Sequence, residues 1–179
     1  MEQLRTLKMV YLAILVAFAV GVHTIEAVLP VPLPVPGVKL GLANIITLLT
    51  IVLYGTRSGL LVASLRSVLG SLISGSFLGF GFYLSFGGSV LSCLAMGGMM
   101  ELYRRKKITL ISVSIAGAVV FNVVQLVLAS MLVQNILLFR GYLPFLLLLS
   151  VPTGLFTGMA AIYLANVIRR IGRPNIFSF

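Results

Sequence analysis

The 179-residue sequence contains no aspartate, one cysteine and one histidine, and its only acidic residues are three glutamates. With so few carboxylates there is no cluster that could hold Mg²⁺ and a diphosphate, and no His/Cys set has the spacing of zinc ligands. The sequence also lacks the G-x-x-x-x-G-K-[ST] loop of P-loop ATPases and shows no nucleophile–base pair. We therefore expect a protein that is not an enzyme and that uses no metal and no cofactor.

Charged residues are also scarce, at 9% of the chain, whereas 60% of the residues are hydrophobic. This composition is typical of an integral membrane protein. The net charge of +10 does not indicate nucleic-acid binding, because the basic residues cluster beside apolar runs, as they do in membrane proteins. The single Cys93 lies within an apolar run, which excludes a disulfide framework.

Six apolar runs approach the length of a membrane-spanning helix, which needs about 20 residues at 1.5 Å each. The runs are Met9–Leu29, Val38–Gly55, Gly59–Ser76, Phe82–Leu102, Ile108–Phe139 and Leu143–Ile168. The sequence therefore predicts an all-α integral membrane protein of the cell membrane, with one domain over residues 1–179 and six transmembrane helices.

Basic residues are distributed unevenly over the connections between these runs. Ten fall on one side of the membrane, including those of the basic loop at residues 103–107, and only Lys39 and Arg140 fall on the other. By the positive-inside rule, both chain termini and the basic loop are expected in the cytoplasm, and the loop after the first run outside. The ten residues are Arg5, Lys8, Arg57, Arg104, Arg105, Lys106, Lys107, Arg169, Arg170 and Arg173.

The segment at residues 30–41 separates the first two runs and has its own character. Four prolines alternate with valine and leucine from Pro30 to Pro36. Proline fixes φ and lacks an N–H, so we expect an extended segment close to polyproline II. Lys39 and Gly41 follow, and irregular backbone beside a membrane is tolerated only where protein buries it or water reaches it. We interpret residues 30–41 as an extracellular lid over a ligand pocket.

A small set of polar residues lies in or beside the apolar runs. Arg66 is about ten residues from either end of its helix, near the membrane midplane, where a charge is costly and usually functional. We expect the set to converge on a substrate pocket that opens to the outside. The candidate substrate-binding residues are His23, Glu26, Lys39, Asn44, Arg66, Asn122 and Gln125.

Each of these residues also has a simpler interpretation. Arg66 could be a structural partner of the serines in its own run, Glu26 and Lys39 could pair with each other, and His23 could be a satisfied buried histidine. The two amides could only join neighbouring helices. The serine seam consists of Ser64, Ser67, Ser71 and Ser74.

The charges of the candidate pocket indicate the class of ligand. Arg66 and Lys39 outweigh Glu26, and Arg140 is the only other cation near the outer half. A guanidinium in a low-dielectric site favours a carboxylate or phosphate, which it can bind bidentately, and the valine- and leucine-rich lid supplies apolar contact. We expect an amphipathic ligand with an anionic head and an apolar body.

Small residues recur at helical spacing in the first run. Ala13, Ala17 and Gly21 lie on one face, opposite the polar residues, and such a stripe lets another helix approach closely. We expect this face to accept a close helix contact, either from a partner or, as ordinary packing, within the chain. A second small-residue stripe in the sixth run is formed by Gly154, Gly158, Ala161 and Ala165.

Three stretches resemble a known family: PGVKLGLANIITLL after the first run, SLRSVLGSLISGSF in the third and FNVVQL in the fifth. They resemble the substrate-binding (S) components of energy-coupling factor (ECF) transporters, in the branch labelled heptaprenyl diphosphate synthase component I or Gx transporter. The resemblance implies a six-helix prokaryotic membrane protein with an outward pocket under the first loop. It also implies a transmembrane coupling subunit, contacted through Ala13 and Ala17, and two cytoplasmic ATPase subunits as partners.

Two alternatives to an uptake component remain open. The chain could be a membrane accessory subunit of prenyl diphosphate synthesis that anchors a soluble synthase through its basic loop. It could also be a facilitator that moves its substrate without other subunits.

Overall fold

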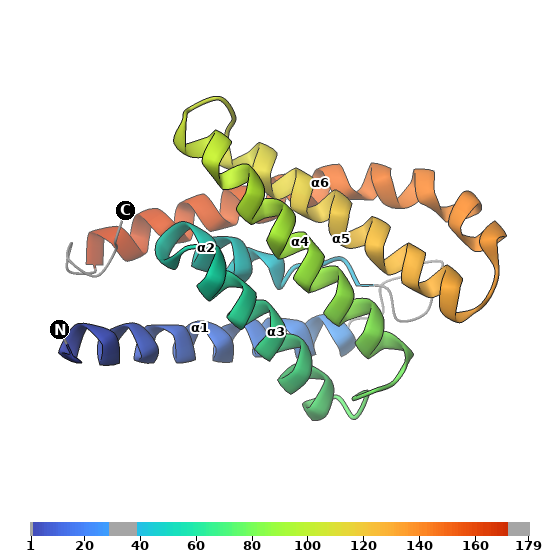
Figure 1. The fold of residues 1–179 in the computed structure, drawn as a ribbon, viewed down its shortest axis with the longest axis horizontal. Helices are drawn as coiled ribbons and strands as arrows, with labels where there is room; N and C mark the ends of the chain where they lie inside the picture. Colours follow the sequence, from blue (N-terminus) through green and yellow to red (C-terminus); the bar gives the residue numbers. More distant parts are fainter. Residues whose placement is uncertain (1, 29–38, 172–179) are drawn as a thin grey trace.

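The computed structural model describes residues 2–28 and 39–171, and within them the protein is all-helical (Figure 1). The proline-rich part of the expected lid, at residues 30–38, lies outside this range. Six helices follow one another along the described chain. They are α1 (Glu2–Val28), α2 (Asn44–Tyr54), α3 (Thr56–Ile73), α4 (Phe80–Arg104), α5 (Leu110–Leu132) and α6 (Ile136–Ile171).

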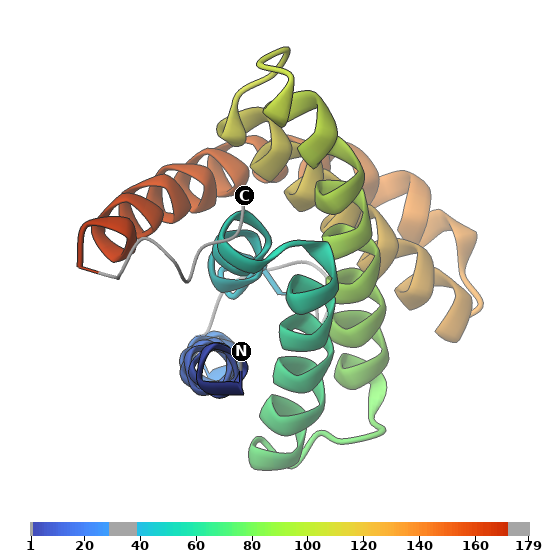
Figure 2. The same cartoon turned by 60° about the vertical axis from the view of Figure 1, so that its left-hand side comes forward.

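The short helix α2 is the centre of the packing. Ten of its eleven residues are buried, because α1, α3 and α6 surround it (Figure 2). Helix α3 also packs against α1 and α4, while α5 lies between α4 and α6. The resulting core joins Leu48 and Ile51 of α2 to Val62 of α3 and Met96 of α4.

Small residues allow the close contact between α5 and α6. A Cβ atom added to Gly154 would lie 2.6 Å from Cα of Ile115, and one added to Gly158 would lie 3.1 Å from Cα of Ile111. Contacts this short between a side chain and a backbone force the helices apart, so the two glycines set the separation of the helix axes. The second small-residue stripe predicted from the sequence therefore packs within the chain.

Four of the helices are long and apolar enough to cross a membrane: α1, α4, α5 and α6. Helix α2 is apolar but only 11 residues long, and α3 carries two arginines and several serines. The protein is thus a multi-pass membrane-helical protein, whereas the count of six spans stays a prediction.

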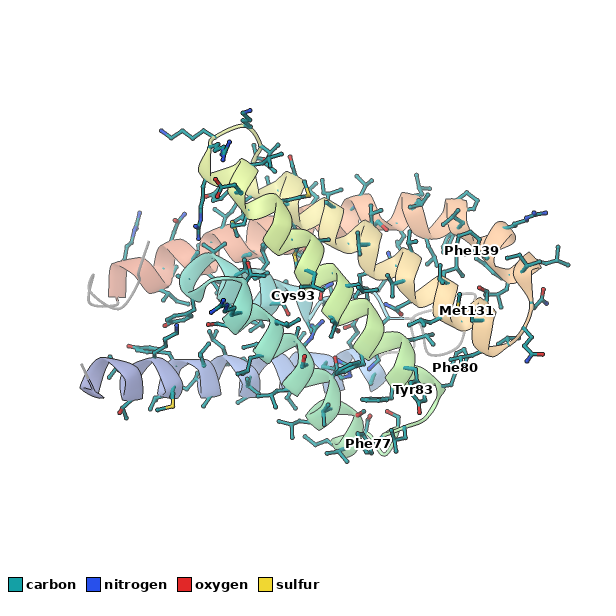
Figure 3. All side chains as sticks on the ribbon, viewed as in Figure 1. Phe77, Phe80, Tyr83, Cys93, Met131 and Phe139 are labelled. Atoms are coloured by element: carbon teal, nitrogen blue, oxygen red, sulfur yellow. The ribbon has the colours of Figure 1, made fainter. Side chains whose placement is uncertain are left out.

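The basic connections gather at one end of the bundle. Figure 1 shows the start of α1, the α2–α3 turn, the α4–α5 connection and the end of α6 at that end. The opposite end carries exposed aromatic residues, including Phe77 and Tyr83 near the start of α4 (Figure 3). Aromatic side chains favour the membrane–water interface. The basic connections lie together at one end, as expected if they share one side of the membrane, but the orientation in the cell stays a prediction.

Two helix boundaries predicted from the sequence are wrong. The second helix begins at Asn44 rather than near Val38, because Gly41 has a positive φ of 81° and Lys39 is held by bonds to another helix. The α5–α6 turn lies at residues 133–135 rather than 140–142, so Arg140 is on α6.

The chemistry of the α5–α6 turn explains its position. Gln134 has φ of 53°, and the Asn135 N–H donates to the Ser130 carbonyl at 3.0 Å, which ends α5 in a Schellman-type closure. The Asn135 side chain then accepts a hydrogen bond from the Leu137 N–H at 3.0 Å and begins α6.

Candidate functional site

Six of the seven predicted polar residues, all except Asn122, meet where the end of α1, residues 39–44, α3 and α5 come together. Arg66 is almost completely buried, with only 1% of its surface exposed. Its Nη2 donates to Oδ1 of Asn44 at 2.7 Å and to Oγ of Ser89 at 2.8 Å. Ser67 donates to the same Ser89 oxygen at 3.2 Å. Helices α2, α3 and α4 are therefore joined through one guanidinium.

The rest of the guanidinium has no partner within the described part of the chain. Nε and Nη1 of Arg66 are buried and donate to no neighbour there, and the buried hydroxyl of Thr47, one turn along α2 from Asn44, also has no hydrogen-bond partner. Buried polar groups are normally satisfied, so unmet donors on a buried cation indicate a place for water or an anion. Arg66 thus offers three free N–H groups inside the bundle.

The hydrogen bonds of Nη2 restrict how an anion can bind Arg66. A guanidinium binds an anion bidentately either through Nε and Nη2 or through Nη1 and Nη2, so both arrangements need a hydrogen of Nη2. Both Nη2 hydrogens are already donated, to Asn44 and Ser89. An anion can therefore reach Nε or Nη1 singly, or bind bidentately only by displacing one of these two oxygens.

Glu26 fixes the chain that leads into α2. Its Oε1 accepts hydrogen bonds from the backbone N–H of Gly41 at 2.5 Å and of Leu42 at 3.3 Å. These N–H groups lie at the N-terminal end of α2, where a negative charge is favourable. A Cβ atom on Gly41 would lie 2.9 Å from the Phe121 ring, so this approach requires glycine.

Lys39 is held at its backbone and at its side chain. Its N–H donates to Oε1 of Gln125 at 2.8 Å, and Nε2 of Gln125 donates back to its carbonyl at 3.2 Å. Its Nζ lies 2.8 Å from Nε2 of His23. No ion pair joins Lys39 to Glu26 in the described ranges, so the direct pairing considered from the sequence is not observed.

Lys39 precedes α2 in the chain, and the burial of its ammonium group lowers the pKa of that group to about 8. The charge of Glu26 opposes this decrease in pKa, and the charge of Arg66 adds to it. His23 is 2% exposed and lies against Gly70, where an added Cβ would be 2.5 Å from its Cδ2. The cluster thus holds two cations with one carboxylate in a confined volume.

Other predicted residues lie outside this cluster. Nδ2 of Asn122 donates to Oγ of Ser150 at 2.8 Å, which directs it toward α6 and matches the helix-joining interpretation. Whether it also contacts a ligand stays a prediction. Arg140 is exposed on α6. The stripe of Ala13, Ala17 and Gly21 is exposed on α1, and its contact with a partner stays a prediction.

Sequence reasoning missed Ser89 and Thr47. Ser85, Ser89 and Ser92 recur on α4 and are all buried, and this recurrence in an apolar helix was a usable signal. Thr47 had no such signal, since threonines in membrane helices commonly bond to their own backbone. No group of three or more His, Cys, Asp or Glu residues that could hold a metal ion occurs among the residues that the structure places.

These features define a multi-pass helical membrane protein with a buried, net-cationic polar cluster. A family model described as heptaprenyl diphosphate synthase component I matches residues 15–164. The chain belongs to this family, as its sequence motifs indicated. No curated protein and no solved structure gives a significant match.

Proposed function

We propose that this protein is a non-enzymatic, substrate-binding subunit of an ATP-driven ECF-type uptake transporter. It captures a small anionic or amphipathic molecule, isoprenoid-related or vitamin-like, on the extracellular side of a prokaryotic cell membrane. The observation that carries the proposal is the buried guanidinium of Arg66, whose Nε and Nη1 have no partner in the described part of the chain.

The surroundings of Arg66 support a ligand site rather than a structural arginine alone. A structural arginine in a membrane is expected to have its donors satisfied by neighbouring carbonyls or acids. Here Lys39 adds a second cation, and the only carboxylate of the cluster, Glu26, is engaged by backbone N–H groups. The uncompensated charge favours a carboxylate or phosphate on the ligand.

The connection of residues 30–41 to the cluster supports their proposed role as a lid. The C-terminal end of the segment is bonded to α1 through Glu26 and to α5 through Gln125. A ligand that enters between these helices therefore contacts the anchors of the lid. The lid supplies the apolar contact that an amphipathic molecule needs.

The proposed partner subunits follow from the resemblance to ECF S components, which implies two cytoplasmic ATPases and one transmembrane coupling protein. These subunits would supply the energy, since the sequence has no P-loop of its own. The exposed stripe of Ala13, Ala17 and Gly21 is the proposed contact with the coupling protein, since small residues permit close helix approach.

Two measurements test this proposal. Native mass spectrometry of the purified protein should detect a bound small molecule, and that molecule should carry a carboxylate or phosphate. Affinity purification from native membranes should recover ATPase and coupling subunits. Recovery of neither subunit in mild detergent would count against the transporter assignment.

The printed family description favours a second candidate, a membrane accessory subunit of heptaprenyl diphosphate synthesis. The exposed basic residues Arg105, Lys106 and Lys107 would then contact a soluble synthase. Co-purification of a soluble prenyltransferase, whose activity rises when this protein is added, would support this role. Loss of that stimulation in a variant with all three changed to glutamine would locate the contact.

A further inference from the structure

A groove runs along the surface between α1 and α3, away from the polar cluster. It consists of two adjoining hollows of about 610 Å³ and about 340 Å³. Met9, Leu12 and Leu61 line both hollows, so the two are continuous. The remaining lining residues are Lys8, Arg57 and Ser58 in the larger hollow and Ala13, Val16 and Leu65 in the smaller one.

The groove is polar at one end and apolar along the rest of its length. Lys8 and Arg57 stand at the polar end, and neither has an ion-pair partner within the described ranges. Nζ of Lys8 lies 5.9 Å from the centre of the Tyr54 ring, which directs the ammonium group toward the start of α3. Both cations therefore line the larger hollow at this end of the groove.

The length of the groove corresponds to one leaflet of a bilayer. From Lys8 to Val16 the helix rises about 12 Å, and half of a bilayer hydrocarbon core is about 15 Å. The basic residues lie at the end of the bundle where the other basic connections gather (Figure 1). Met9, Leu61 and Leu65 are 63%, 48% and 40% exposed, so the apolar walls are open to the lipid phase.

We propose that this groove is a specific site for one anionic phospholipid. The phosphate lies between Lys8 and Arg57, and one acyl chain follows the apolar walls toward Val16 and Leu65. Two cations flanking a headgroup position discriminate between lipids by net charge, so phosphatidylglycerol binds in preference to phosphatidylcholine. The uncompensated charge at the mouth favours this occupant over an apolar helix of another protein.

The first test is native mass spectrometry of the full chain in detergent, titrated with phosphatidylglycerol or phosphatidylcholine. The wild-type protein should retain phosphatidylglycerol preferentially. The variant Lys8→Gln with Arg57→Gln should lose this preference by roughly thirtyfold, since each basic residue near a lipid surface contributes about 1 kcal/mol. The control variant Lys107→Gln with Arg170→Gln, exposed basic residues away from the groove, should behave as wild type.

A second variant tests the apolar part of the site without changing charge. Leu61→Trp fills the groove from α3 and should lower retention of both lipids, while circular dichroism and the melting temperature check that the protein is folded. Equal retention of the two lipids by the wild-type protein would overturn the proposal, as would an equal loss in the control variant. Unchanged retention in Leu61→Trp would also contradict it.

A photocrosslinking residue identifies the occupant in native membranes. Benzoylphenylalanine at position 61 should label phospholipid, with phosphatidylglycerol enriched over its share of the membrane. A crosslink to a protein in place of lipid would overturn the proposal and assign the groove to a partner subunit.

Discussion

Replacing Arg66 tests whether this residue binds the ligand or only stabilises the fold. Its free donors would form charge-assisted hydrogen bonds to an anionic ligand, each contributing about 1.5–3 kcal/mol. Arg66→Ala should therefore raise the Kd for the native ligand by roughly ten- to a hundredfold. Arg66→Lys should weaken binding less, because it keeps the charge but loses the planar geometry.

The stability of the ligand-free protein should respond differently. Arg66 is a buried cation without an ion-pair partner in the described part of the chain, and such burial costs several kcal/mol. Its two hydrogen bonds, to Asn44 and Ser89, return an amount of similar size. Arg66→Ala should consequently shift the melting temperature by only a few degrees in either direction.

A matched control is Ser114→Ala, which removes a buried hydrogen bond of 2.7 Å to Thr157 between α5 and α6. It should cost about 1 kcal/mol of stability and leave ligand affinity unchanged. Isothermal titration calorimetry with the molecule identified by mass spectrometry measures both variants. A neutral or cationic native ligand would refute the reasoning, and so would an Arg66→Ala variant that binds as tightly as the parent.

Three further predictions concern the partner face, the pH dependence and the packing of the cluster. Ala13→Trp with Ala17→Trp should abolish uptake by the assembled transporter but leave ligand binding intact, because both positions are exposed; unchanged uptake would contradict the proposed contact. Anion affinity measured by calorimetry should fall as pH rises through about 8, where Lys39 loses its proton, and a flat profile from pH 6.5 to 9.5 would exclude this contact. Gly70→Ala should displace His23 and lower stability by about 1–3 kcal/mol in a thermal melt, whereas no change would show that the ring has room to move.

Much of the cluster could be predicted from depth alone. An apolar run fixes the height of each residue in it at 1.5 Å per residue, so Arg66 could be placed near the midplane without any coordinates. His23, Glu26 and Gln125 could be placed in the outer half in the same way. The direction in which each side chain faces around its helix axis was harder to predict, because neighbouring polar residues can face different helices. Gln125 contacts Lys39, whereas Asn122, less than one turn away, faces α6.

The partners of Glu26 show a limit of sequence reasoning. A carboxylate and a lysine in the same candidate pocket suggested an ion pair, yet the groups that donate to this carboxylate are the backbone N–H groups of Gly41 and Leu42. Because almost every residue has a backbone N–H group, the sequence does not show which of these groups binds a carboxylate. The positive φ of Gly41 turns these N–H groups toward Glu26, and only the glycine itself hinted at that geometry.

The contacts of Asn44 link the candidate anion site to the entry of α2. Asn44 is the first residue of this helix, and its side chain occupies one hydrogen of Nη2 on Arg66. A bidentate anion on Arg66 needs a hydrogen of Nη2, so it must release either Asn44 or Ser89. Release of Asn44 would loosen the start of α2 from α3, while Glu26 and Gln125 still hold residues 39–42 to α1 and α5. Release of Ser89 would instead remove one bond between α3 and α4, which Ser67 still joins through Ser89, and would leave α2 in place. The two binding geometries therefore differ in which helix contact they break.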